Sequence, residues 1–196
     1  MRQQSERQGQ HQEEQAFVQR VPEILKVPGI QVQQQEQDAV IAEGFIAPVP
    51  VAERGRLIEA YSRLLHDPDQ STRERAGVAW STWESSTITL LQHPETIERF
   101  TEPAFAVAFA RIENHYFMNK GWFEPEQLLR DAAKLKDIPG VIVQGRYDMC
   151  TPAFTAWALH QAWPEADFQM IPDAGHSFEE PGIRAALLDA TDRFAN

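Results

Sequence analysis

The chain has 196 residues, 42% of them hydrophobic, which is enough for one ordinary domain with a buried core. Its formal net charge is −11, and a surface this acidic repels the phosphate backbone of nucleic acids. The single cysteine, Cys150, excludes an intrachain disulfide, and neither a membrane-spanning apolar run nor a secretory signal is present. We therefore expect a soluble, cytoplasmic protein that binds neither nucleic acid nor membranes.

Residues 1–37 form a glutamine-rich leader. It holds twelve glutamines in two clusters, and its polar beginning has too little apolar surface to offset the entropy of ordering. We expect disorder there and assign no chemistry to the segment. Between the clusters, five apolar residues at helical spacing predict a short amphipathic helix that ends before Pro28-Gly29. These residues are Phe17, Val18, Val21, Ile24 and Leu25.

Residues 38–136 are predicted to form a helical region. The stretch 53–67 has apolar residues at helical spacing, and Asp67-Pro68-Asp69 ends it. Ser71 and Glu74 have the spacing of a capping box, which predicts that Ser71 caps a second helix.

Three helices complete this region in the prediction. The helix that follows Ser71 carries Trp80 and Trp83 on its apolar positions. A further helix is expected over 104–117. The last covers 124–135, with Pro125 in its first turn.

From residue 137 to 196 the pattern alternates between strand and helix. The run GVIVQG (140–145) is short, apolar and β-branched, as in a buried parallel strand, and 167–174 predicts a second strand. Helices are expected over 152–163 and 182–196. Strand, helix, strand and helix with short connections predict the edge of a doubly wound α/β sheet, and two parallel strands alone do not make a stable one.

Asp148 and His176 each follow one of the two predicted strands. Side chains at the carboxyl ends of parallel strands can meet, and an aspartate that orients a histidine is part of a Ser-His-Asp triad. The order Asp148 then His176 is the order found in α/β-hydrolases. The residue types alone also allow an ordinary interpretation, in which the aspartate caps a turn and the histidine has no catalytic task.

Four ordered stretches resemble proline iminopeptidases, which are α/β-hydrolase serine exopeptidases. The resemblance covers about Pro50 to Asn196 and is weaker near its start. It implies an incomplete α/β-hydrolase, with a helical cap at 38–136 and the last two parallel strands and helices of the sheet at 137–196. The stretches are AWSTWE (79–84), FARIENHYF (109–117), IPGVIVQGRYDMCTP (138–152) and WPEADFQMIPDAGHSFEEPGI (163–183).

The resemblance also implies roles for four residues. Asp148 and His176 match the family's triad acid and base, and Glu84 and Glu113 match cap glutamates that hold the imino group of the substrate. A prolyl N-terminus is a secondary ammonium with two N–H donors, so each carboxylate could accept one charge-assisted hydrogen bond. The competing interpretation is that both glutamates are solvated helix residues. We expect no cofactor and no metal.

The catalytic serine of an α/β-hydrolase lies in a G-x-S-x-G elbow between a strand and a helix. The chain has serines at 5, 62, 71, 81, 85, 86 and 177, and none has this setting. We therefore expect no nucleophile in this chain, negligible hydrolysis, and an apolar edge on the strand at 140–145 that invites association with another chain.

Three hypotheses follow for function. The first is a proline iminopeptidase-like serine exopeptidase that releases N-terminal proline from peptides. The second is a non-catalytic module that binds N-terminal proline. The third is a half-enzyme that needs a separate serine-bearing chain, joined through the exposed sheet edge. The same edge could instead join two copies of this chain. Cys150 is expected to be a buried, inert thiol; the alternative is a thiol close enough to the triad to make the site sensitive to thiol reagents.

Overall fold

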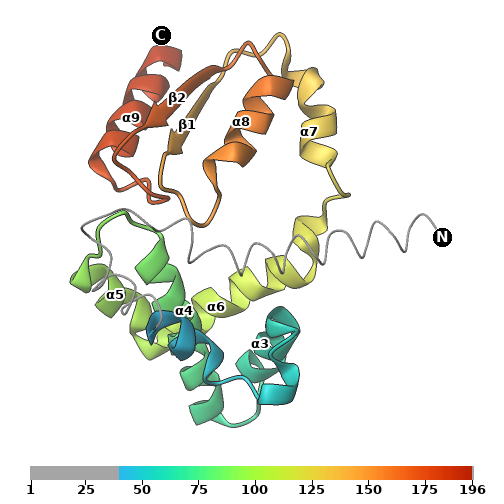
Figure 1. Cartoon of the computed structure of the whole chain (residues 1–196), viewed down its shortest axis with the longest axis vertical. Helices are drawn as coiled ribbons and strands as arrows, with labels where there is room; N and C mark the ends of the chain where they lie inside the picture. The colour runs from blue at the N-terminus through green and yellow to red at the C-terminus, as the bar shows by residue number, and fades with distance from the viewer. Residues whose placement is uncertain (1–39, 196) are drawn as a thin grey trace, which may run out of the picture. The chain divides into compact units, whose positions relative to one another are not determined.

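A computed structural model describes residues 40–195 (Figure 1), so the leader 1–37 and its expected short helix lie outside the described residues. The chain from Gly44 onward belongs to one compact unit. Residues 40–46 are helical. The further elements are η1 (Val51–Glu53), α3 (Leu57–Leu65), α4 (Gln70–Thr87), α5 (Pro94–Thr101), α6 (Pro103–Met118), η2 (Lys120–Trp122), α7 (Gln127–Asp131), η3 (Ala132–Leu135), β1 (Val141–Gly145), α8 (Ala153–Ala162), β2 (Asp167–Ile171) and α9 (Pro181–Phe194).

Helices α3, α4 and α6 enclose an apolar core. The amphipathic spacing of α3 places Tyr61 and Leu65 on one face, and both are fully buried. Asn114 on α6 is also buried, and its amide donates to the Ile58 carbonyl of α3 at 2.8 Å, so its polar group is satisfied. The core consists of Val49, Ala60, Tyr61, Leu64, Leu65, Ala76, Trp80 and Ala110.

Helices α4 and α6 approach each other closely because Gly77 has no side chain. An added Cβ at position 77 would lie 2.9 Å from the backbone N and Cα of Val107. One turn later, the buried Ser81 hydroxyl donates to the Ala106 carbonyl at 3.4 Å. These contacts determine how near the two helices, and the glutamates they carry, come to one another.

Three local expectations for the helical region were wrong. Asp69, not Ser71, caps α4, because its carboxylate accepts the Thr72 N–H at 2.8 Å and so leaves Ser71 inside the first turn. Pro125 lies before α7 rather than in its first turn. Glu126 adopts a left-handed φ of 57°, which breaks the expected helix 124–135 and leaves a short α7 followed by η3.

Helix α5 was not expected at all, although its signals are present in the sequence. Pro94 occupies the first helical position, Glu95 lies in the first turn and Arg99 in the last, as the helix dipole favours.

The two predicted strands and their parallel pairing are confirmed. Val141 pairs with Asp167 and Gly145 with Ile171, and α8 connects the strands. Figure 1 shows α8 and α9 on either side of the strand pair. β1 is less buried than expected: its residues 141–143 are only half-buried, because β2 is its one partner strand within residues 40–195. None of the described helices has the length and apolarity to cross a bilayer.

Replacing Gly77 by alanine should destabilise the chain. Alanine favours a helix over glycine by about 1 kcal/mol, but forcing a methyl group against the Val107 backbone costs about 1–3 kcal/mol. We therefore expect a net loss of about 1 kcal/mol in the free energy of urea unfolding. Gly55→Ala is the matched control, because an added Cβ there has no atom within 4 Å. Equal stability of the two variants would contradict the close approach.

Candidate active site

The loops that follow β1 and β2 are held side by side beyond the ends of the strands. The Arg146 N–H donates to the Ile171 carbonyl at 2.9 Å, and the Tyr147 N–H donates to the Ala174 carbonyl at 3.0 Å. The parallel pairing therefore continues into both loops, and Asp148 and His176 come next in each.

The lack of a side chain at Gly145 allows these two loops to touch. A Cβ on Gly145 would lie 1.8 Å from the Gly175 carbonyl oxygen, which no side chain could tolerate. Gly145 lies three residues before Asp148, and Gly175, whose carbonyl it contacts, lies one residue before His176.

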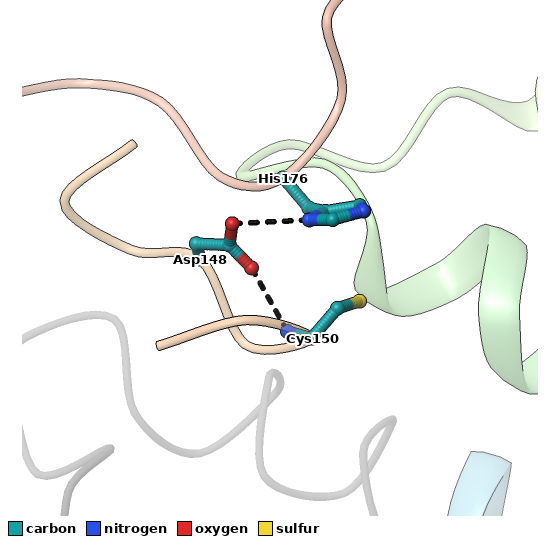
Figure 2. A group of neighbouring side chains, drawn as sticks. All are labelled: Asp148, Cys150 and His176. Carbon is teal, nitrogen blue, oxygen red and sulfur yellow. Dashed lines mark hydrogen bonds and ion pairs between the residues drawn. The ribbon is translucent and has the colours of Figure 1, made fainter. Parts of the chain in front are cut away.

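The structure brings Asp148 and His176 together, as expected from their order (Figure 2). The distance from Asp148 Oδ2 to His176 Nδ1 is 3.0 Å. The aspartate side chain is 5% exposed and the histidine side chain 38% exposed. A buried carboxylate thus holds one ring nitrogen, and the ring retains access to solvent. The catalytic role of the pair stays a prediction.

The backbone of Cys150 orients the carboxylate together with Thr151 and Gln144, two residues that the sequence analysis did not single out. Asp148 Oδ1 accepts the backbone N–H groups of Cys150 at 3.0 Å and Thr151 at 2.7 Å. Asp148 Oδ2 accepts the Thr151 hydroxyl at 2.8 Å and the buried Gln144 amide at 3.1 Å. With Nδ1 donating to the carboxylate, the neutral ring keeps Nε2 as its proton acceptor, the tautomer that a general base requires.

The hydrogen bond affects the ionisation of both partners. Desolvation is the largest influence on Asp148 and acts upward, but hydrogen bonds from His176 and Thr151 hold the pKa of Asp148 below its usual value. The hydrogen bond to Asp148 raises the pKa of His176 above its usual value against the opposing effect of desolvation. The charges of Asp148, Glu84 and Glu113 raise it further.

Backbone hydrogen bonds join the histidine loop to the chain just after α4. The Ile88 carbonyl accepts the N–H groups of His176 at 2.9 Å and Ser177 at 2.7 Å. The buried Glu180 carboxylate accepts the Gly175 N–H at 2.7 Å and the Leu90 N–H at 3.3 Å. The imidazole is therefore anchored close to the end of the helix that carries Glu84.

Glu84 on α4 and Glu113 on α6 are half-buried rather than solvated. Burial raises the pKa of Glu84, and the charge of His176 partly opposes this. Burial raises the pKa of Glu113 to about 7, with a downward influence from a Trp80 hydrogen bond and an upward one from Glu84. The two carboxylates therefore lie within electrostatic range of each other and of His176, and their role in binding stays a prediction.

Cys150 is exposed, which corrects the expectation of a buried thiol. Its sulfur nevertheless lies among groups that oppose ionisation: desolvation and then the negative charges of Glu84, Asp148 and Glu113 raise the pKa of Cys150 to about 12. The thiolate form needed for reaction or metal ligation is therefore disfavoured.

Asp148, Cys150 and His176 have ligand atoms within 4.8 Å of one another (Figure 2), a grouping that could receive a metal ion. Both carboxylate oxygens of Asp148 already accept hydrogen bonds, and the Cys150 thiol resists deprotonation. A metal would have to displace these donors and the thiol proton. The arrangement fits an acid–histidine pair better than a metal centre.

Replacing Asp148 by asparagine should lower the pKa of His176. The variant loses the negative charge that stabilises the imidazolium and keeps only a neutral amide oxygen as acceptor, whereas desolvation, which favours the neutral ring, remains. The measurement is a pH titration of the His176 ring protons by NMR. Asp173→Asn is the control, because this exposed residue lies three positions from His176 and has no bond to its ring in the structure. An unchanged His176 pKa in Asp148→Asn would contradict the pairing.

Comparison with known proteins identifies the family of the chain. Residues 30–180 match the family described as alpha/beta hydrolase fold. The chain is 50% identical to a probable proline iminopeptidase of Leptolyngbya boryana over 153 residues, which are 78% of this chain and 48% of the relative.

Two further relatives are proline iminopeptidases. The protein of Xylella fastidiosa (strain Temecula1) is 52% identical over 76% of this chain and 48% of its own length. The protein of Arabidopsis thaliana is 44% identical over 77% of this chain and 40% of its own length. The chain thus spans about half the length of these curated relatives. It belongs to the α/β-hydrolase fold family, and the part it contains is similar to proline iminopeptidases.

Proposed function

We propose that this chain supplies the acid–base pair and the substrate-binding carboxylates of a serine exopeptidase that releases N-terminal proline from peptides. The observation that carries the proposal is the gathering of Glu84 and Glu113 around the hydrogen-bonded Asp148 and His176. The proline iminopeptidase relatives support it. We also propose a cytoplasmic location, from the acidic composition and the single cysteine.

In the proposed reaction, a serine hydroxyl attacks the prolyl carbonyl carbon and its proton passes to His176 Nε2. The C–N bond then breaks, and His176 returns the proton to the leaving amine. Water next attacks the acyl-enzyme, again through His176, and proline leaves. Asp148 keeps the ring in the correct tautomer and stabilises its protonated form.

The serine in this proposal comes from sequence outside the 196 residues. None of the chain's serines lies in a G-x-S-x-G elbow. Ser177, the nearest to His176 in sequence, is buried, and its hydroxyl accepts the Glu179 N–H at 3.2 Å. It has no elbow that would present it to the imidazole.

Glu84 and Glu113 are proposed to hold the secondary ammonium of the N-terminal proline. The two carboxylates match its two N–H donors, and only the first residue of a peptide offers such a cation. Because the pKa of Glu113 is about 7, this carboxyl is about half ionised at neutral pH. Because the ammonium requires the charged form, binding should strengthen as the pH rises through that value and should release a proton.

The free edge of β1 is the proposed contact for the serine-bearing segment. Within the described residues, β1 pairs only with β2, and its residues 141–143 are half-buried. The unpaired edge of an apolar strand is suited to accept another strand. The fitting occupant is the hydrolase sheet that carries the elbow, because the part matched by this chain is only 48% of each of two curated relatives.

Replacing Glu84 or Glu113 by glutamine should weaken binding of a prolyl dipeptide amide about 10-fold or more, since a hydrogen bond to a charged group contributes about 1.5–3 kcal/mol. Calorimetric titration at pH 8 measures the affinity. Glu59→Gln, on the exposed face of α3, is the matched control and should bind like the original chain. The N-acetylated peptide should not bind. Full affinity in both site variants would reject the ammonium site.

Catalysis is tested by supplying the missing nucleophile. The 196-residue chain alone, freed of host peptidases, should not hydrolyse a prolyl chromogenic amide. Activity should appear when it is co-produced with the segment of the Leptolyngbya boryana relative that carries the G-x-S-x-G elbow expected of the family. His176→Ala should abolish that activity.

The outcomes separate the three hypotheses. Turnover by the chain alone that His176→Ala removes would reveal a nucleophile within it. A complex that forms, binds the prolyl peptide and stays inactive would favour the non-catalytic binding module. Self-association that competes with the added segment would assign the β1 edge to a second copy instead.

A further inference from the structure

We propose that Trp80 is a positioning residue for substrate recognition: its indole N–H holds one carboxylate oxygen of Glu113 and leaves the other for the substrate ammonium. This inference rests on the proposed role of Glu113. It adds a residue that does not touch the substrate but orients the carboxylate that binds the substrate ammonium.

The geometry of the Trp80 indole supports this role. Its Nε1–H donates to Glu113 Oε2 at 2.7 Å, a short hydrogen bond to a carboxylate. The side chain is 4% exposed, and its rings pack against Phe45, Tyr61 and Phe117 at centroid distances of 5.8, 5.1 and 6.0 Å. An indole enclosed in this way has little freedom to change rotamer, so its N–H is a fixed reference point.

The backbone explains how one residue links the two helices that carry the glutamates. Trp80 and Glu84 lie four residues apart on α4 and therefore share one face of that helix. Glu113 lies on α6, which the glycine at position 77 allows to approach α4 closely. The indole thus spans the two helices and ties Glu113 to the face that carries Glu84.

If Trp80 had a purely structural role, its indole N–H would not need a carboxylate as acceptor. A buried indole N–H needs an acceptor, but a backbone carbonyl satisfies it without placing a carboxylate in a half-buried site. Here the acceptor is a carboxylate that burial and the neighbouring Glu84 both push toward its neutral form. The bond from Trp80 opposes both influences and so favours the charged form that a cation requires.

Other charged groups also act on Glu113. Glu84 acts from α4 and raises its pKa, and His176 acts from the loop after β2 and lowers it. Cys150, from the loop after β1, is influenced by the Glu113 charge but stays neutral, since its pKa is about 12. Trp80 is the neutral donor in this group, so replacing it changes the ionisation of Glu113 without adding or removing a charge.

The test is Trp80→Phe, which keeps an aromatic ring in the core and removes the N–H. In the ligand-free chain, NMR titration of the Glu113 carboxyl carbon should give a pKa above the original value. Affinity for the prolyl dipeptide amide should fall about 10-fold at pH 7, from loss of one hydrogen bond to a charged group. The loss should shrink as the pH rises to 8. The ligand ionises identically in every experiment. The ratio of the original chain's affinity to the variant's affinity at each pH therefore depends only on ionisation of the protein.

Trp83→Phe is the matched control, since Trp83 also lies on α4 and packs against Phe45, at a centroid distance of 5.3 Å. Trp83→Phe should leave the Glu113 pKa unchanged, and it should also leave the pH dependence of prolyl dipeptide amide binding unchanged. A loss of affinity that is equal at pH 7 and pH 8 in Trp80→Phe, with an unchanged Glu113 pKa, would reduce Trp80 to a packing residue and overturn the inference.

A double-variant cycle keeps the inference testable if Trp80→Phe is less stable. If Trp80 acts through Glu113, then Trp80→Phe should have no further effect on affinity in a Glu113→Gln background. Additive losses would overturn the inference. If the original chain binds no prolyl ligand, the proposed function fails, whereas the titration of Glu113 still decides whether Trp80 controls its ionisation.

Discussion

Two backbone hydrogen bonds to one carbonyl oxygen hold the candidate site together. The Ile88 carbonyl accepts the N–H groups of His176 and Ser177, and so joins the end of α4 to the loop after β2. Without this link, the helical region and the strand pair would contribute separate halves of a site. With it, the carboxylate of Glu84, one turn before Ile88, lies within electrostatic range of the imidazole that Asp148 orients. Glu180 adds a second link through Gly175 and Leu90.

The site concentrates negative charge around one ring. Asp148, Glu84 and Glu113 all favour the protonated form of His176, and the last two are themselves pushed toward neutrality by burial. Such raised pKa values often mark functional groups, because a fold gains nothing from half-burying carboxylates that lack a cation. A bound ammonium would supply the missing positive charge. The positive charge of the proposed substrate therefore complements the negative charge of the site.

The sequence predicts the strand pair and the acid–histidine pair well, because both follow from local pattern. Strand periodicity places Asp148 and His176 at adjacent strand ends, and chain order assigns them roles. The contact between Trp80 and Glu113 joins residues 33 positions apart and depends on helix packing, which no local pattern reveals. The cap of α4 was misplaced because Asp69 and Ser71 are both good capping residues, and only the backbone decides between them.

The close contact between Gly145 and the Gly175 carbonyl means that the spacing of the acid and the base is determined by main chain meeting main chain. Side chains around the pair could change over evolution without moving it. A single methyl group at position 145 would separate the loops, even though that residue takes no part in any chemistry. Natural variation should therefore be tolerated at the polar residues around the pair. It should be nearly absent at Gly145, although glycine has no functional group.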